Sequence, residues 1–142
     1  MTIQSIDVLY TAVATAENGR DGRVASDDGN LDVVVNPPKE LGGSGAGTNP
    51  EQLFAAGYSA CFQSALGGVA RQAKADVSGS RVTAKVGIGK SADGGFGLTV
   101  ELAVHIPNVD EATAKELAEK AHQVCPYSNA TRGNIAVELS VI

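Results

Sequence analysis

The 142-residue sequence predicts an α+β fold in which antiparallel sheets surround one long, buried central helix. The helix is predicted at residues 49–74, which are apolar around most of a helical circumference, as is typical of a helix buried on all sides. Alternating apolar and polar residues indicate half-buried strands. These strands are expected at 82–88, 96–106 and 135–142, with a hairpin turn at Asp93-Gly94-Gly95. A second helix, at 110–125, is separated from the first by strands, which argues against a repeating βαβ fold.

The segment before the central helix is expected to form a small antiparallel meander. Its β-forming residues indicate strands at 9–15, 24–26 and 31–35. Glycines on either side of Arg20-Asp21 indicate a turn between the first two strands. Pro37-Pro38 is expected to end the meander.

Both predicted helices carry recognisable start signals. Thr48 or Asn49 can cap the central helix, and Pro50 suits its first position. Asp110 is a plausible N-cap for the second helix, and Pro126 is expected to stop that helix directly after Cys125.

Length and composition indicate a single globular domain spanning 1–142. The hydrophobic fraction is 43%, and the formal net charge of −5 argues against a nucleic acid or an anionic membrane surface as partner. No leader-like start or transmembrane run is visible, so a cytoplasmic location is expected. Two cysteines are too few for a disulfide-stapled scaffold, so they are either small buried hydrophobes or working thiols.

Phosphate-binding and metal-binding patterns are incomplete. The glycine-rich segment 42–47 precedes a helix, but Thr48-Asn49 follows where a Walker motif needs Lys-Ser/Thr. Cys61, His122 and Cys125 lack the spacings of a zinc site. No cofactor and no metal are therefore expected.

Cys61 needs a neighbouring cation if it is to be chemically active. A thiol midway along an apolar helix has a raised pKa and stays inert. Arg20, in a loop flanked by Gly19 and Gly22, is a candidate cation that would itself need an anion. Cys125 lies on the apolar stripe of the second helix and could pair with Cys61, but the residues alone leave open whether both cysteines simply fill space.

Three stretches of the sequence resemble the organic hydroperoxide resistance (Ohr) proteins of the OsmC-like family. They are residues 9–12 with 19–22, residues 49–62, and residues 122–134. The run Tyr127-Ser128-Asn129-Ala130-Thr131-Arg132 favours the Ohr branch over the OsmC branch.

The resemblance implies a thiol peroxidase that reduces alkyl and fatty-acid hydroperoxides to alcohols. It implies a peroxidatic role for Cys61, a resolving role for Cys125, and an Arg20–Glu51 pair that holds the Cys61 thiolate. Cys61 sulfenic acid would condense with Cys125, and a lipoyl-type dithiol, dihydrolipoamide on a carrier protein, would reduce the Cys61–Cys125 disulfide.

The resemblance also implies a homodimer. Ten residues separate Glu51 from Cys61, about 15 Å along an uninterrupted helix, which is long for one bridging arginine. An antiparallel second copy of the helix would shorten that gap. We therefore expect an intertwined homodimer whose two interfacial sites each take Arg20, Glu51 or both from the other chain.

Three alternatives stay open. One is an OsmC-type peroxidase with a different substrate or reductant range. Another is a small hydrophobic-ligand binding protein with structural cysteines, and a redox-switched regulator is the third. Phe54 and Tyr127 are candidates for lining the substrate pocket of the expected peroxidase.

Overall fold

The structure, a computed structural model, describes residues 3–142. The chain divides into two compact units, Met1–Leu53 and Phe54–Ile142. The prediction of a single domain over 1–142 stays a prediction. Within residues 3–142 no helix combines the length and hydropathy needed to cross a bilayer.

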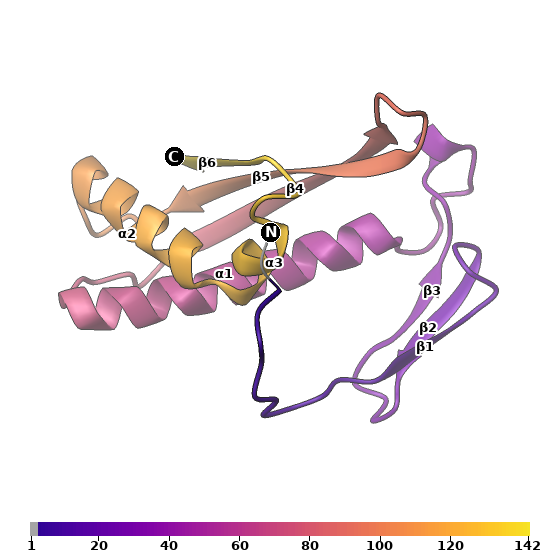
Figure 1. The fold of residues 1–142 in the computed structure, drawn as a ribbon, viewed down its shortest axis with the longest axis horizontal. Helices are drawn as coiled ribbons and strands as arrows, with labels where there is room; N and C mark the ends of the chain where they lie inside the picture. The colour runs from indigo at the N-terminus through magenta and orange to yellow at the C-terminus, as the bar shows by residue number, and fades with distance from the viewer. Residues whose placement is uncertain (1–2) are drawn as a thin grey trace. The chain divides into compact units, whose positions relative to one another are not determined.

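The N-terminal unit contains the predicted meander. Its strands are β1 (Ala14–Glu17), β2 (Gly22–Ser26) and β3 (Asp32–Val35), paired antiparallel in the order β1-β2-β3 (Figure 1). Asn18 and Gly19 both have positive φ, at 63° and 57°, and turn the chain between β1 and β2. A short 3₁₀ helix, η1 (Lys39–Leu41), follows Pro37-Pro38.

The first strand begins later than predicted. Residues 9–13 form no strand, and the apolar side chains of Leu9 and Tyr10 are 98% and 78% exposed. The reason is the length of the partner: β2 ends at Ser26, which lies opposite Ala14. Residues before 13 therefore have β-forming side chains but no neighbouring strand within the described chain.

The central helix α1 runs from Pro50 to Ala73, as predicted. The Asn49 side-chain oxygen accepts a hydrogen bond from the Gln52 amide at 2.8 Å and caps its first turn. Only one face of α1 is fully buried in a single chain. This face carries Tyr58, Phe62, Leu66, Val69 and Ala70. Ala56 and Ala60, on another face, are exposed. The predicted burial of the helix on all sides is therefore not found in a single chain.

The C-terminal unit carries a second sheet in the order β4-β5-β6. Strands β4 (Arg81–Lys90) and β5 (Phe96–His105) form the predicted antiparallel hairpin. Strand β6 (Val137–Val141) pairs parallel with β5, so the expectation of antiparallel sheets is wrong for this pair. Two helices lie between β5 and β6 in the chain, and such a crossover connection is what a parallel pairing requires.

Those two helices are α2 (Glu111–Val124) and α3 (Pro126–Thr131). Asp110 caps α2 as predicted, accepting from the Thr113 amide at 2.8 Å. Pro126 ends α2 but also takes the first position of α3, which was not anticipated.

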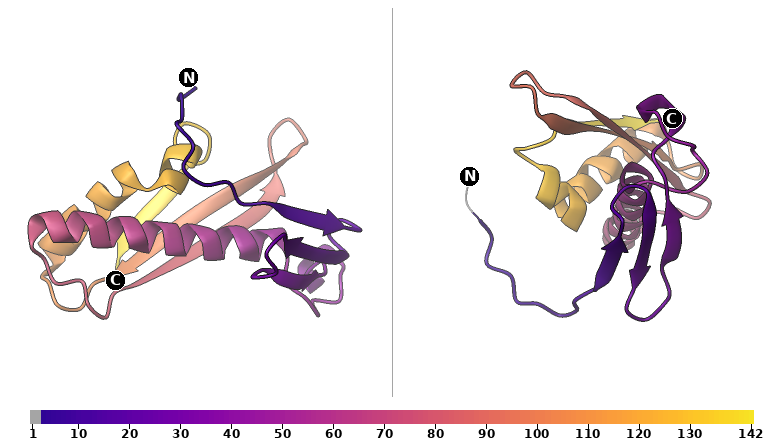
Figure 2. Two further views of the ribbon diagram at one scale, coloured as in Figure 1. Left: turned by 90° about the horizontal axis from the view of Figure 1, so that it is seen from below. Right: turned by 90° about the vertical axis from the view of Figure 1, so that its right-hand side faces the viewer.

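The core of the C-terminal unit forms where α1 and α2 cover one side of the β4-β5-β6 sheet (Figures 1 and 2). Alternate residues of β5 point into it, and α2 contributes its predicted apolar stripe. Its buried members include Phe62, Leu66, Val100, Leu102, Val104, Leu117 and Cys125. The same packing that buries Cys125 therefore holds α1 against α2.

Replacing Phe62 by alanine is expected to lower the free energy of unfolding by about 3–5 kcal/mol, because its fully buried ring would leave a cavity. Phe96 is the matched control: its ring is 74% exposed, so Phe96→Ala is expected to change stability by about 0.5 kcal/mol or less. Urea unfolding measures both. Equal losses in the two variants would contradict this description of the core.

Candidate active site

The two cysteines lie together in the C-terminal unit. Cys61 is midway along α1, and Cys125 lies at the corner between α2 and α3, where it is both the C-cap of one helix and the N-cap of the next. Their sulfur atoms are 3.6 Å apart, and both thiols are free. A disulfide needs an S–S distance of about 2.05 Å. A small movement of the α2–α3 corner would therefore be enough to join them.

The surroundings of Cys61 within this unit favour the neutral thiol. Burial against apolar side chains raises the pKa of the Cys61 thiol above its ordinary value. The Tyr127 backbone N–H acts in the opposite direction, and the contact with the Cys125 thiol raises the pKa further. Cys61 therefore needs a positive charge from elsewhere to become a thiolate near neutral pH.

Tyr127 reaches Cys61 because α3 begins one residue before it. The amides of a helix's first turn have no partner within the helix, which leaves the Tyr127 N–H free for the sulfur. The Tyr127 ring packs across α1, with ring-centroid distances of 6.0 Å to Phe54 and 5.7 Å to Tyr58. A Cβ on Gly57 would lie 2.9 Å from the Tyr127 hydroxyl, so glycine lets the ring approach the helix.

A cavity of about 620 Å³ opens beside Cys61. It lies along the C-terminal half of α1 and reaches the end of α2. Its lining is Cys61, Ser64, Ala65, Gly68, Val69, Arg71, Gln72, Val124 and Pro126. The expected lining residues Phe54 and Tyr127 are not part of it, because their rings pack on each other and on Tyr58.

Arg20 and Glu51 form a two-pronged ion pair in the N-terminal unit. Arg20 Nη2 donates to Glu51 Oε1 at 2.8 Å, and Arg20 Nη1 donates to Glu51 Oε2 at 3.0 Å. Arg20 comes from the turn after β1, and Glu51 lies in the first turn of α1. This geometry fixes the orientation of the guanidinium plane.

The Arg20 hydrogen bonds lower the pKa of the Glu51 carboxyl, whose side chain is only 11% exposed, and burial opposes them. The pKa of Arg20 is raised by the same hydrogen bonds. Both groups therefore stay charged across the neutral range.

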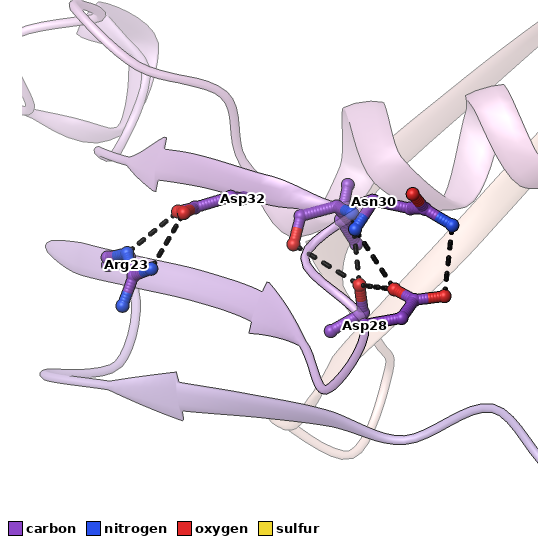
Figure 3. A network of polar contacts seen from close by, with 6 residues as sticks. Arg23, Asp28, Asn30 and Asp32 are labelled. Atoms are coloured by element: carbon purple, nitrogen blue, oxygen red, sulfur yellow. Dashed lines mark hydrogen bonds and ion pairs between the residues drawn. The ribbon is translucent and has the colours of Figure 1, made fainter.

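A second two-pronged pair occupies the same meander (Figure 3). Arg23 Nε and Nη2 donate to the two Asp32 oxygens, each at 2.7 Å. Next to it, Asp28 accepts hydrogen bonds from Ser26 and Asn30 and closes the β2–β3 turn. Arg23 and Asp32 are each about half exposed, so this pair is a surface contact across two strands.

A buried polar cluster was missed by the sequence analysis. Tyr58, Ser128 and Thr131 are almost completely buried and are hydrogen-bonded to one another, and the ring of His122 contacts Ser128 at 2.7 Å. The signal available was weak: Ser128 and Thr131 lie one helical turn apart directly after Pro126. Among residues 3–142 no group of three histidine, cysteine or acidic side chains could hold a metal ion.

The fold and the paired thiols define a class of α+β protein with two free cysteines on neighbouring helices. The family model of OsmC-like proteins matches residues 42–140. The organic hydroperoxide resistance protein of Xanthomonas axonopodis pv. citri is 56% identical over 136 residues, covering 94% of this chain and 95% of the relative. OhrB of Bacillus subtilis is 46% identical over 134 residues, covering 94% and 98%.

Solved structures give the same result. The organic hydroperoxide resistance protein of Elizabethkingia anophelis matches with a TM-score of 0.90 and 58% identity, covering 96% of this chain and 98% of that one. The structure of Bacillus subtilis OhrB matches with a TM-score of 0.87 and 45% identity, covering 95% and 100%. The chain belongs to the OsmC-like family and, within it, to the organic hydroperoxide resistance proteins.

Replacing Arg20 by alanine is expected to raise the pKa of Glu51, which NMR titration of the carboxyl carbon measures. The pKa of Glu51 is lower in the folded chain than in the unfolded chain, so the ion pair stabilises the fold at pH values above the ordinary carboxyl pKa. This stabilisation is lost as the pH falls through the lowered pKa of the folded chain. Arg20 is 47% exposed, so the stabilisation is about 1 kcal/mol or less. Arg23→Ala is the control, raising the pKa of Asp32 and leaving Glu51 unchanged. An unchanged Glu51 pKa in Arg20→Ala would contradict the pairing.

Proposed function

We propose that this protein is a cysteine-based peroxidase that reduces organic hydroperoxides to alcohols. The observation that carries the proposal is the 3.6 Å contact between the Cys61 and Cys125 sulfurs beside a largely apolar cavity. The names of its relatives, which are organic hydroperoxide resistance proteins, agree with it.

In the proposed reaction the Cys61 thiolate attacks the terminal oxygen of the hydroperoxide. The O–O bond breaks, sulfur is oxidised to sulfenic acid, and the alkoxide leaves with a proton as the alcohol. The Cys125 sulfur then attacks the sulfur of that sulfenic acid, the S–O bond breaks, and water leaves as the disulfide forms. An external dithiol returns both cysteines to thiols and is itself oxidised to a disulfide.

Arg20 is proposed to supply the charge that Cys61 lacks. An arginine cannot be deprotonated in a protein, so near the sulfur it lowers the thiol pKa and can also contact the peroxide oxygens. The two hydrogen bonds to Glu51 prevent the guanidinium from rotating away. Glu51 is thus proposed to act through Arg20 and not on the substrate.

The chemistry of the cavity favours hydroperoxides with an apolar body. Side chains such as Ala65, Val69 and Val124 supply apolar surface next to Cys61. Alkyl and fatty-acid hydroperoxides bury such surface, whereas hydrogen peroxide gains nothing from it. The proposed reductant is a lipoyl-type dithiol, dihydrolipoamide on a carrier protein, in the cytoplasm, and no bound cofactor is required.

A homodimer is proposed as the working form. Apolar side chains in the first residues are exposed in the single chain, among them Ile3 at 94% and Leu9 at 98%. Ala56 and Ala60 on α1 are also exposed. Apolar surface on two parts of one chain is typical of subunit interfaces. An intertwined dimer would cover it and would allow Arg20 of one chain to serve Cys61 of the other.

Peroxidase kinetics with dihydrolipoamide test the function. Wild type is expected to reduce an alkyl hydroperoxide faster than hydrogen peroxide, and Cys61→Ser to lose at least about a thousandfold in rate because the nucleophile is gone. Cys125→Ser is expected to form alcohol in the first turnover but no intramolecular disulfide. Absence of peroxidase activity in wild type would favour the hydrophobic-ligand binding alternative, in which both cysteines are structural, and full activity of Cys61→Ser would overturn the role proposed for Cys61.

Mixing two inactive chains tests the shared site. If Arg20 acts across the interface, a mixed dimer of Cys61→Ser and Arg20→Ala chains contains one complete site, and random pairing should restore about a quarter of wild-type activity. Replacing the second partner by a Cys61→Ser/Arg20→Ala double variant gives the blank. No recovery from chains shown to exchange would mean that each site uses its own arginine.

A further inference from the structure

A chain of hydrogen bonds connects the three helices that carry and flank the cysteine pair. Ser128 Oγ lies 2.7 Å from His122 Nδ1 and 2.8 Å from the Tyr58 hydroxyl. The Tyr58 hydroxyl lies 3.1 Å from Thr131 Oγ1, which donates to the Ser128 carbonyl at 3.2 Å. The cluster links α1, α2 and α3.

Counting protons gives each bond a direction. Thr131 uses its only hydroxyl proton on the Ser128 carbonyl, so it accepts from Tyr58. Tyr58 then has no proton left for Ser128, so Ser128 donates to Tyr58 and must accept from His122 Nδ1–H. Each hydroxyl proton is therefore used in one hydrogen bond of the chain. Removing any one of the three hydroxyl groups interrupts the chain.

Two further hydrogen bonds stabilise the corner between α2 and α3. The Asn129 amide donates to the Cys125 carbonyl at 2.9 Å, and Arg132 Nη2 donates to the His122 carbonyl at 2.6 Å. That carbonyl lies in the last turn of α2, where it has no partner within the helix. Cys125 therefore lies between two helices, α2 and α3, whose junction is held by hydrogen bonds. The Ser128 bond to Tyr58 connects this junction to α1, the helix that carries Cys61.

We propose that Ser128, with Tyr58 and Thr131, is a positioning residue that holds the Cys125 thiol against Cys61 for disulfide formation. This inference rests on the proposed peroxidase function. None of the three hydroxyl groups touches the sulfur atoms in this role. They act by fixing the α2–α3 corner relative to α1.

The consequence is a competition for Cys61 sulfenic acid. If Cys125 attacks its sulfur, water leaves and the disulfide forms. If a second hydroperoxide arrives first, sulfenic acid takes another oxygen, the second hydroperoxide becomes alcohol, and sulfinic acid results, which thiols do not reverse. A loosened corner slows only the first branch, so the ratio of sulfinic acid to disulfide reports the position of Cys125.

The experiment measures that ratio by mass spectrometry after exposure to a fixed dose of cumene hydroperoxide. Ser128→Ala, Tyr58→Phe and Thr131→Val each remove one hydroxyl, and loss of one buried hydrogen bond is expected to raise the ratio about tenfold. The rate of the first oxidation is followed by stopped flow in each variant as a separate measurement, because the Tyr127 amide and the Cys125 thiol, which both affect the pKa of Cys61, belong to the same corner. The ratio is decided only after that oxidation.

Two further variants serve as rescue and control. Thr131→Ser keeps the hydroxyl and should restore the wild-type ratio. Ser59→Ala removes a hydroxyl that donates to the Ala56 carbonyl of its own helix and has no other side-chain bond within residues 3–142, and it should leave the ratio unchanged. The three hydroxyl-removing variants are compared at a temperature below the unfolding temperature of each. Any one of them that folds therefore tests the positioning role.

A wild-type ratio in the folded deletion variants would overturn the positioning role while leaving the peroxidase proposal standing. A ratio that rises in Ser59→Ala as much as in Ser128→Ala would also overturn it, because the effect would then be a general loosening of α1. If wild type does not oxidise Cys61 with hydroperoxide at all, the proposed function fails, and the inference fails with it.

Discussion

The proposed chemistry of this protein depends on how the burial of Cys61 is offset. Packing in the C-terminal unit raises the pKa of the Cys61 thiol, and the Tyr127 amide opposes this only in part. A sulfur in such surroundings is protected from indiscriminate oxidation but is a poor nucleophile until a cation approaches. The Arg20–Glu51 pair has the geometry that this task needs, because two hydrogen bonds hold the guanidinium in one plane. In the proposed reaction one positive charge activates the thiol, and the apolar surface of the adjacent cavity favours substrates with an apolar body.

Backbone features and core packing together place the second cysteine. Pro126 ends α2 and starts α3, so Cys125 lies where the two helices meet, and the Tyr127 amide interacts with the Cys61 sulfur. Gly57 makes room on α1 for the Tyr127 ring, which packs this corner against the helix. The buried hydroxyl cluster of Tyr58, Ser128 and Thr131 is proposed to supply the remaining constraint. The cysteine pair is thus held by a short helix that contributes no charge of its own.

Features with a local cause could be predicted from the sequence, and features that depend on a distant partner could not. Helix α1 carries its own cap and Pro50, and the β4–β5 hairpin carries its own turn, so both were located closely. Residues 9–13 have strand-like side chains but no partner, and strand alternation in 137–141 does not reveal that its neighbour runs parallel. The separation of the two thiols and the cluster around Ser128 arise from packing of α1 against the α2–α3 corner, which no single segment encodes.

The pKa of Cys61 is the most direct measure of whether Arg20 activates this thiol. Thiolate absorbance near 240 nm, followed against pH in a Cys125→Ser background, reports that one sulfur. We predict a pKa well below the ordinary thiol value of about 8.5 when Arg20 is present, and a value above it in Arg20→Ala, where the Tyr127 amide offsets burial only in part. A pKa at or above the ordinary value with Arg20 intact would contradict the account, because the thiolate on which the proposed reaction depends would then be almost absent at neutral pH.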